Sequence, residues 1–276
     1  MRRMPWETRA FMTSSAAKNV FITGAGAGIG RAAALRFAKA GWRVGLFDVD
    51  EAAVAALAQA LHPALTFHGR LDVSQAQDWQ VQLAAFAQFS GDSLDVLVNN
   101  AGISATAPFT DTPLARHHQL VDVNIKGVIN GCHLAFPYLK RTPGARVINL
   151  CSASALFGQP MLSSYSATKA AVRSLTESLS IEWRAHGIAV ADLLPLFVNT
   201  AMVTGDVSRM KTVSTLGVRL SAEDVAAAIE RLATMAHHRM PLHTTVGLQT
   251  RLFALLGKLS PDAINRFVTA RMAGYK

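Results

Sequence analysis

The chain has 276 residues, of which half are apolar and only 16% are charged, a composition that supports a large core and excludes a disordered protein. Its formal charge of +9 is confined to residues 1–20 and 231–276, whereas residues 21–230 hold sixteen basic and sixteen acidic side chains. A neutral body without a basic face argues against a nucleic-acid partner.

Cysteine content and hydropathy indicate where the protein works. Cys132 and Cys151 have no zinc-like spacing and form no disulfide framework, which fits a reducing compartment. Residues 1–17 contain arginines without a following apolar stretch, so we interpret them as an N-terminal extension and not as a secretory signal. No apolar run approaches the ~20 residues that cross a bilayer. We therefore expect a cytoplasmic protein.

Strand and helix patterns alternate along the chain from residue 19 onward. We expect strands at 19–23, 43–47, 64–68, 94–98, 145–151 and 188–193, and helices at 28–40, 51–61, 74–89, 113–140 with one break, 163–186 and 221–236. This alternation predicts an α/β fold, a doubly wound parallel sheet in a single domain at 18–247, with a helical extension at 248–276. Ligands of such sheets bind beyond the carboxyl ends of the strands.

A glycine-rich turn, Thr23–Gly30 (TGAGAGIG), follows the first predicted strand and opens the first helix. Glycine permits positive φ and close approach of the backbone to a phosphate. The helix start at Gly28 adds N–H groups and a positive dipole end. This context predicts a dinucleotide-binding loop with the contact residues Gly24, Gly26, Gly28, Ile29 and Gly30.

Asp48 ends the second predicted strand, 18 residues after Gly30. A carboxylate here can accept hydrogen bonds from both ribose hydroxyls of NAD and repels the 2′-phosphate of NADP. We therefore expect NAD as the cofactor in preference to NADP. The alternative is that Asp48 only caps the helix that begins near Asp50.

Two later segments extend the predicted cofactor site. Asp72-Val73 follows the third strand and either contacts adenine or caps the next helix, two interpretations to which we give equal weight. The segment Asn99-Asn100-Ala101-Gly102 follows the fourth strand. Such residues also end strands without a further purpose, but their register with the other sites places Asn100, Ala101 and Gly102 beside the cofactor.

The chemically reactive residues follow the fifth strand. Ser152 ends that strand, and Tyr165 and Lys169 are four residues apart on one face of a helix. A free tyrosine titrates near ~10, so a base that works near pH 7 needs a shift of about 3 units, or roughly 4 kcal/mol. One ammonium at ~4 Å, with an effective dielectric of ~20, supplies about this energy. The pattern predicts that Tyr165 transfers a proton and that Lys169 keeps it active.

These motifs, in this order, resemble the short-chain dehydrogenase/reductase family over roughly residues 18–230. The matching motifs are TGxxxGxG at Thr23–Gly30, NNAG at Asn99–Gly102, Asn124 in VNIKG, Ser152, and YxxxK at Tyr165–Lys169. The resemblance implies a Rossmann fold, hydride transfer with NAD or NADP, and assembly as a homo-oligomer, either a dimer or a tetramer, through helices 113–140 and 163–186.

The resemblance also implies a role for each matching residue. Ser152 would hydrogen-bond the substrate oxygen, Tyr165 would exchange its proton, and Lys169 would bind the nicotinamide ribose. Asn124 would hold a water that links Lys169 to solvent. After the sixth strand Leu196 replaces the usual glycine, but Pro195, Val198 and Thr200 match cofactor-binding positions. The family's glycine-rich C-terminal strand ending is absent.

The remaining sequence predicts an apolar pocket and its cover. Phe157, Met161, Leu162, Phe197 and Met202 match substrate-contact positions, and residues 201–220 have the composition of a mobile lid. Residues 248–276 form two short basic amphipathic helices. We favour packing over the pocket or a subunit interface for this tail, with attachment to anionic lipid as the alternative.

The cysteine beside Ser152 and a group of three histidines could have further roles, in redox chemistry and in metal binding, which we do not favour. Cys151 adjoins Ser152, and we interpret it as a buried strand residue in preference to a redox residue. His237, His238 and His243 have no supporting acidic or cysteine ligands nearby in the sequence, so we expect no metal site.

The function predicted from sequence is an NAD-preferring oxidoreductase that interconverts a secondary alcohol and a ketone on a hydrophobic small molecule. Tyr165 is its expected general acid/base. The alternative is a dinucleotide-binding regulatory or scaffold protein without catalysis, against which the intact Ser152, Tyr165 and Lys169 argue.

Overall fold

The computed structural model describes residues 17–205 and 210–275. Residues 1–16 of the expected N-terminal extension and residues 206–209 of the expected lid lie outside this part. The strands are β1 (Asn19–Thr23), β2 (Arg43–Asp48), β3 (Thr66–Arg70), β4 (Val96–Asn99), β5 (Arg146–Leu150), β6 (Ala189–Pro195), β7 (Val198–Asn199), β8 (Leu220–Ser221) and β9 (His243–Val246). The α-helices are α1 (Gly28–Lys39), α2 (Glu51–Gln59), α3 (Ala76–Ser90), α4 (Leu114–Val121), α5 (Gly127–Arg141), α6 (Ser163–Glu182), α7 (Ala201–Thr204), α8 (Lys211–Leu216), α9 (Ala222–Thr234), α10 (Leu248–Leu259) and α11 (Asp262–Ala273).

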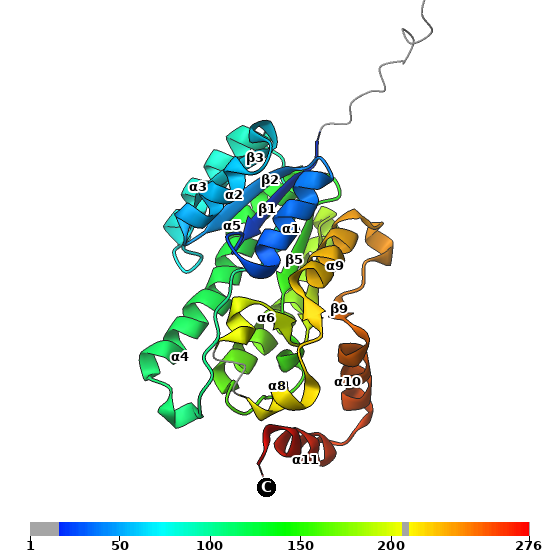
Figure 1. Ribbon diagram of the computed structural model, residues 1–276. Coiled ribbons are helices and arrows are strands. Elements are labelled where there is room, and N and C mark those ends of the chain that lie inside the picture. The colour runs from blue at the N-terminus through cyan, green and yellow to red at the C-terminus, as the bar shows by residue number, and fades with distance from the viewer. Residues whose placement is uncertain (1–16, 206–209, 276) are drawn as a thin grey trace, which may run out of the picture.

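Within the described residues, seven strands form one parallel sheet in the order β3-β2-β1-β4-β5-β6-β9. The chain order reverses between β1 and β4, where the two halves of a doubly wound sheet meet. The predicted α/β fold is therefore confirmed (Figure 1). β7 and β8 pair separately, beyond the end of β6.

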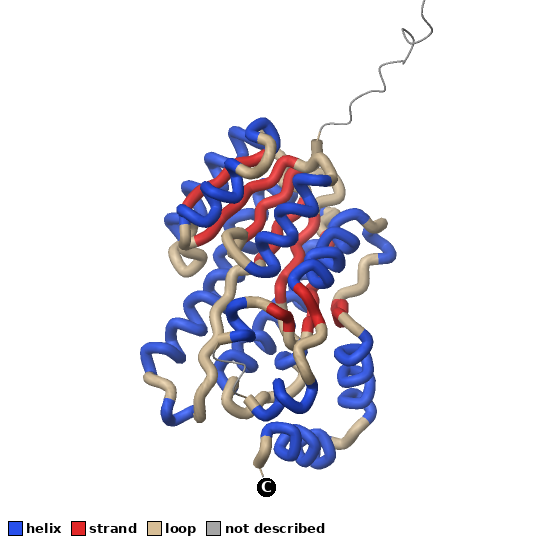
Figure 2. Tube along the Cα trace, in the orientation of Figure 1, coloured by secondary structure: helices blue, strands red, loops and turns tan. Residues whose placement is uncertain are grey.

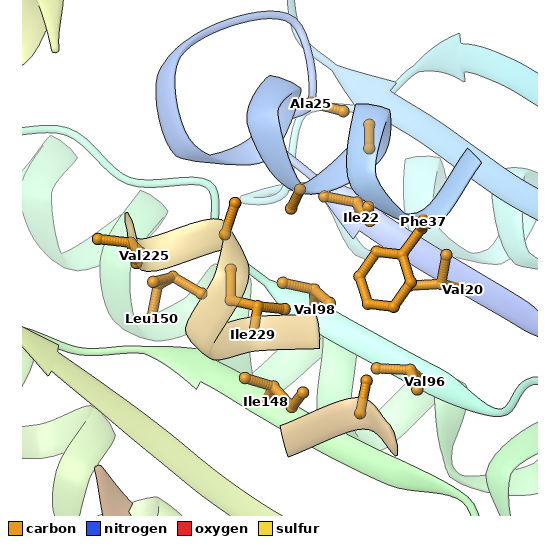
Figure 3. Close-up of a cluster of buried hydrophobic side chains, with 14 of the residues drawn as sticks. Val20, Ile22, Ala25, Phe37, Val96, Val98, Ile148, Leu150, Val225 and Ile229 are labelled. Atoms are coloured by element: carbon orange, nitrogen blue, oxygen red, sulfur yellow. The ribbon is translucent and has the colours of Figure 1, made fainter. Parts of the chain in front are cut away.

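Helices cover both faces of the sheet (Figure 2). On one face α1, α2 and α9 pack on the strands, and Figure 3 shows Phe37 of α1 and Ile229 of α9 against strand residues such as Val20 and Val98. On the other face α3, α5 and α6 contribute to a second core, in which Trp79 of α3 stacks on Phe21 of β1. The strands are apolar on both sides. Full burial of each large apolar side chain there contributes about 1.5–3 kcal/mol to the stability of the fold.

The strands differ from the sequence prediction at β3, at β9 and at the short strands β7 and β8, which were not predicted. β3 begins at Thr66, two residues later than expected, because Pro63–Leu65 forms a 3-10 turn. β9 was not predicted: His243–Val246 extends the sheet beside β6, and Gly247 follows it with φ of +85°. The expected break in helix 113–140 is a π-helical turn at Asp122–Lys126 between α4 and α5.

The C-terminal helices α10 and α11 follow β9 and lie at the end of the molecule near α8, on the lower right of Figure 1. Contacts between α11 and α8 hold them against the body. Among the residues that the structure describes, no helix is both long and apolar enough to span a bilayer.

Candidate active site

A cleft of about 480 Å³, the strand-end cleft, opens at the carboxyl edge of the sheet. It gathers fourteen of the residues predicted to bind the cofactor: Gly24, Gly28, Ile29, Asp48, Asp72, Val73, Asn100, Ala101, Gly102, Tyr165, Lys169, Pro195, Val198 and Thr200. These residues come from segments far apart in the sequence. The sheet order brings them together because every parallel strand ends at the same edge.

The glycine loop has the geometry that its sequence predicts. Gly24 and Gly28 have φ of +64° and +51°, conformations that side chains disfavour. Gly30 does not line the cleft, but a Cβ there would lie 2.0 Å from the carbonyl oxygen of Gly24. Its role in the fold is therefore to let α1 pack against the turn.

Asp48 lies at the end of β2 and faces the strand-end cleft. Its Oδ2 accepts a hydrogen bond of 2.9 Å from the Gly26 backbone, and its Oδ1 accepts one of 3.1 Å from the Asp50 backbone. The helix cap is a different residue, since Asp50 accepts from the Ala53 backbone at the start of α2. Gly26 does not line the cleft, and a Cβ there would lie 3.0 Å from Asp48 Oδ2.

The two segments after β3 and β4 are fixed by local hydrogen bonds. Asp72 lines the cleft and also closes a turn, since its Oδ1 accepts from the Ser74 backbone at 3.0 Å and from the Ser74 hydroxyl at 2.7 Å. Thr23 Oγ1 accepts from the backbone N–H groups of Asn100 and Ala101, both at 3.0 Å. The NNAG segment is thereby tied to the glycine loop.

A second cavity, of about 250 Å³ and mostly apolar, adjoins the cleft, and we refer to it as the tail cavity. Ser152 and Tyr165 line both spaces. Predicted pocket residues Phe157, Leu162, Phe197 and Met202 line the tail cavity, whereas Met161 lies outside its lining. The α10 and α11 segment forms one wall, which confirms that the tail packs over the pocket. The residues it contributes are Phe253, Leu256, Gly257, Ser260, Ile264, Asn265, Val268, Thr269 and Met272.

Sequence reasoning missed the polar side chains of the tail cavity. The Ser154 hydroxyl is buried in the cavity wall and has no hydrogen-bond partner among the described residues. Gln159 Nε2 donates to Thr212 Oγ1 at 2.8 Å in the same wall. The position of Ser154, two residues after Ser152, was the signal that could have found it.

Tyr165 and Lys169 share one face of α6, as predicted, but their electrostatics differ from expectation. Burial raises the pKa of Tyr165 to about 12, and a hydrogen bond with Ser152 opposes this shift. Burial also lowers the pKa of Lys169. Lys169 Nζ lies 5.7 Å from the Tyr165 ring centre and donates to the Leu150 carbonyl at 2.7 Å. In the chain alone, desolvation therefore outweighs the predicted attraction.

Asn124 is fully buried in the π-helical turn. Its Oδ1 accepts from the Ile103 backbone and its Nδ2 donates to the Ile103 carbonyl, both at 2.9 Å. Nδ2 also donates to Thr168 Oγ1 at 3.1 Å, one residue before Lys169. Asn124 therefore joins the loop after β4 to the helix that carries Tyr165 and Lys169.

The structure shows the surroundings of Cys151 and His243, for which the sequence left a redox role and a metal site as alternatives. Cys151 is buried, as predicted, and burial raises the pKa of its thiol to about 12. His243 does have acidic neighbours, which come from other elements: its Nδ1 lies 2.9 Å from Asp192 and its Nε2 3.1 Å from Glu177. In the part of the chain that the structure describes, no cluster of histidine, cysteine and carboxylate side chains has the composition of a metal site.

Comparison with known proteins agrees with this arrangement. Residues 18–211 match the family model described as short chain dehydrogenase. The chain belongs to the short-chain dehydrogenase family. Sulfoacetaldehyde reductase 2 of Chromohalobacter salexigens is 35% identical over 226 residues, which cover 79% of this chain and 89% of that protein.

Solved structures of other proteins share the fold. A 3-ketoacyl-(acyl-carrier-protein) reductase from Brucella melitensis, complexed with NADH, has a TM-score of 0.76 and 28% identity and covers 83% of this chain and 96% of its own. ElxO, with NADP bound, has a TM-score of 0.75 and 26% identity, and the match covers 83% of this chain and 97% of ElxO. The family uses nicotinamide cofactors, and these two structures hold one of each kind.

Proposed function

We propose that this short-chain dehydrogenase interconverts a secondary alcohol and a ketone on a hydrophobic small molecule, with Tyr165 as general acid/base and NAD as the preferred cofactor. The observation that carries the proposal is that Ser152 and Tyr165 lie where the strand-end cleft meets the apolar tail cavity. A substrate in the tail cavity can therefore present its oxygen to both hydroxyls.

The residues of the strand-end cleft fit a nicotinamide dinucleotide. No side chain of the described residues caps the start of α1, so its first N–H groups and dipole are suited to a pyrophosphate. Gly24 and Gly28 keep the loop close to that position. Lys169, Val198 and Thr200 would hold the nicotinamide half, and Asp72 and Val73 the adenine half. A bound dinucleotide supplies or takes the hydride.

The protein's own groups manage the proton. Because burial raises the pKa of Tyr165 to about 12, its hydroxyl is protonated at neutral pH and can donate to a carbonyl oxygen. Ser152 would donate a hydrogen bond to the same oxygen. The Lys169 ammonium, 5.7 Å from the ring centre, stabilises the phenolate that proton transfer leaves. Asn124 acts as a positioning residue through Ile103 and Thr168, and its predicted bound water stays a prediction.

Replacement of the proposed acid/base tests the reaction. We expect Tyr165→Phe to lower turnover by about 10²–10⁴-fold, because the ring remains and only the transferable proton is lost. Dinucleotide binding should survive, because the other residues of the strand-end cleft remain. Turnover would be followed by the absorbance of the reduced cofactor with a panel of hydrophobic secondary alcohols and ketones, and affinity by calorimetric titration.

The same measurements separate catalysis from a scaffold role. Full activity of Tyr165→Phe would rule out Tyr165 as the acid/base. A wild-type chain that binds NAD tightly yet turns over no member of the panel would favour the non-catalytic alternative.

Asp48 carries the proposed preference for NAD. Its carboxylate lines the strand-end cleft and would repel a 2′-phosphate, so we expect Asp48→Ala to raise the NADP-to-NAD ratio of kcat/KM by about tenfold or more. Asp50→Ala is a matched control because Asp50 caps α2 instead of lining the cleft. The control should cost about 0.5–2 kcal/mol of stability and leave the ratio unchanged. A wild-type preference for NADP would contradict the assignment.

A further inference from the structure

The C-terminal tail, residues 248–275, has an inner face that contacts the body of the protein and lines the tail cavity. Its Gly257 packs so closely on Phe157 that a Cβ would lie 2.1 Å from the ring. Gln249 Nε2 donates to the Leu216 carbonyl of the body at 3.2 Å, and within the tail Asn265 joins α11 to the Gly257 and Ser260 carbonyls at the end of α10. The tail is therefore a fixed part of the cavity wall, which leaves its opposite side to face outward.

The outer face of the tail is apolar to an unusual extent. Leu248, Leu252, Leu255 and Leu259 recur at the spacing of one helix face in α10, and each is at least half exposed. Phe267 is 67% exposed on α11. Nine of the nineteen large apolar side chains exposed in the described part of the chain belong to this tail, and six of the nine do not line the tail cavity. Single exposed apolar residues are normally scattered over a protein surface, whereas a contiguous group of them indicates an interaction surface.

Basic side chains border this apolar face. Arg251 and Lys258 are seven residues apart and lie along one side of the leucine row of α10. Arg266 and Arg271 surround Phe267 in a shallow depression on α11. Within residues 17–205 and 210–275, none of these four cations forms an ion pair. The surface therefore presents apolar side chains and uncompensated positive charge together.

We propose that the outer face of α10 and α11 docks on an anionic phospholipid bilayer. The leucines and Phe267 would enter the boundary between headgroups and acyl chains, and the four cations would contact lipid phosphates. Docking of this kind places the wall of the tail cavity against the lipid. It is an interfacial attachment, consistent with the lack of a spanning helix among the described residues, and it does not depend on the proposed reaction.

Charge favours a bilayer over a second copy of the chain as the occupant. A two-fold interface pairs a surface with itself, so it would bring the cations of both tails into one contact. Like charges brought together in an interface are unfavourable. Asp262 is the single acidic residue of the tail and cannot neutralise them. An anionic bilayer complements both the charge and the apolar side chains.

The test is sedimentation of the full chain with vesicles. One set is phosphatidylcholine alone, and the other contains about three parts phosphatidylcholine to one part phosphatidylglycerol. We expect binding to the mixed vesicles only, weakened when salt rises from about 0.1 M to 1 M because the Debye length falls from ~10 Å to ~3 Å. Absence of wild-type binding to the mixed vesicles at low salt would overturn the proposal.

Charge-reversal variants locate the contact. Each cation near an anionic surface changes partition by about fivefold, so R251E/K258E should reduce binding at least about twentyfold. K39E/R231E makes the same change in net charge at exposed positions outside the tail and should bind like wild type. Equal binding of the two double variants would overturn the assignment to the tail. Unchanged melting temperatures would show that both variants fold.

An apolar variant separates lipid from self-association. L255Q/F267Q should lose vesicle binding while keeping the wild-type mass in light scattering, and Val81→Gln on α3 serves as the control for an exposed apolar replacement. If L255Q/F267Q instead lowers the mass in solution and leaves vesicle binding intact, the face is an interface between copies and the proposal fails.

Discussion

Tyr165 and Lys169 show how burial acts in opposite senses on an acid and on a base. Desolvation disfavours the charged form of each, so the pKa of Tyr165 rises to about 12 and that of Lys169 falls. A sequence shows that the two side chains share a helix face, but not how dry that face is. The expectation of a low pKa for Tyr165 therefore considered the attraction by the Lys169 ammonium but not the desolvation of the phenol.

The pKa of Tyr165 gives a pH prediction with a definite sign. Ketone reduction needs the protonated hydroxyl, so its kcat/KM should be level at neutral pH and fall only as pH rises toward the tyrosine pKa. Alcohol oxidation needs the phenolate, so its kcat/KM should increase with pH, about tenfold per unit, below that pKa. Rates measured in both directions between about pH 6 and 10 check this. Oxidation that declines over this range would contradict it.

The site residues that could be predicted from the sequence were those in motifs with a defined spacing. The glycine loop, Asp48, and the pair Tyr165 and Lys169 all lie at the strand-end cleft, because strand ends determine their positions. Ser154 was not anticipated. Its position two residues after Ser152 could have suggested that it lies near the site, but the lack of a partner for its hydroxyl is known only when all neighbours are placed.

At the scale of elements, three side chains join α6, β6 and β9. His243 of β9 lies between Asp192 of β6, which is fully buried, and Glu177 of α6. Glu177 is on the helix that carries Tyr165 and Lys169. The contact therefore fixes the seventh strand, and the tail that follows it, relative to the reactive helix.

Loss of the central member should destabilise the fold. We expect His243→Ala to lower the free energy of unfolding by about 1–3 kcal/mol, because it leaves the buried Asp192 carboxyl without its partner. His238→Ala, at an exposed position nearby, should change stability by no more than about 0.5 kcal/mol. Urea denaturation of both variants measures the difference, and equal midpoints would show that the contact contributes nothing.

Elements were predicted well where an apolar run is bounded by turn residues. Six strands were found this way, and β3 was displaced because Pro63 starts a 3-10 turn inside the run. β9 escaped because its four residues, His-Thr-Thr-Val, form no apolar run. Its strand conformation depends on pairing with β6, a contact 51 residues away between His243 and Asp192.

At the scale of the whole molecule, exposed apolar residues on α4 to α6 support a homo-oligomer. Ile181 is 76% exposed and Ile129 is 45% exposed, on the two long helices expected to form the interface. We expect light scattering to give the mass of a dimer or tetramer. Ile181→Glu should shift it toward the monomer, because a charge buried in an interface without a partner is unfavourable. A monomeric wild-type chain would contradict this expectation.

The π-helical turn at Asp122–Lys126 has a consequence for how this part of the chain tolerates length changes. In an α-helix each residue advances by about 100° around the axis. Deletion of one residue from the turn would rotate α4 against α5 and swing Asn124 away from Ile103. The π-helical turn therefore fixes the rotation of α4 relative to α5, so the number of residues between these two helices cannot change without moving Asn124.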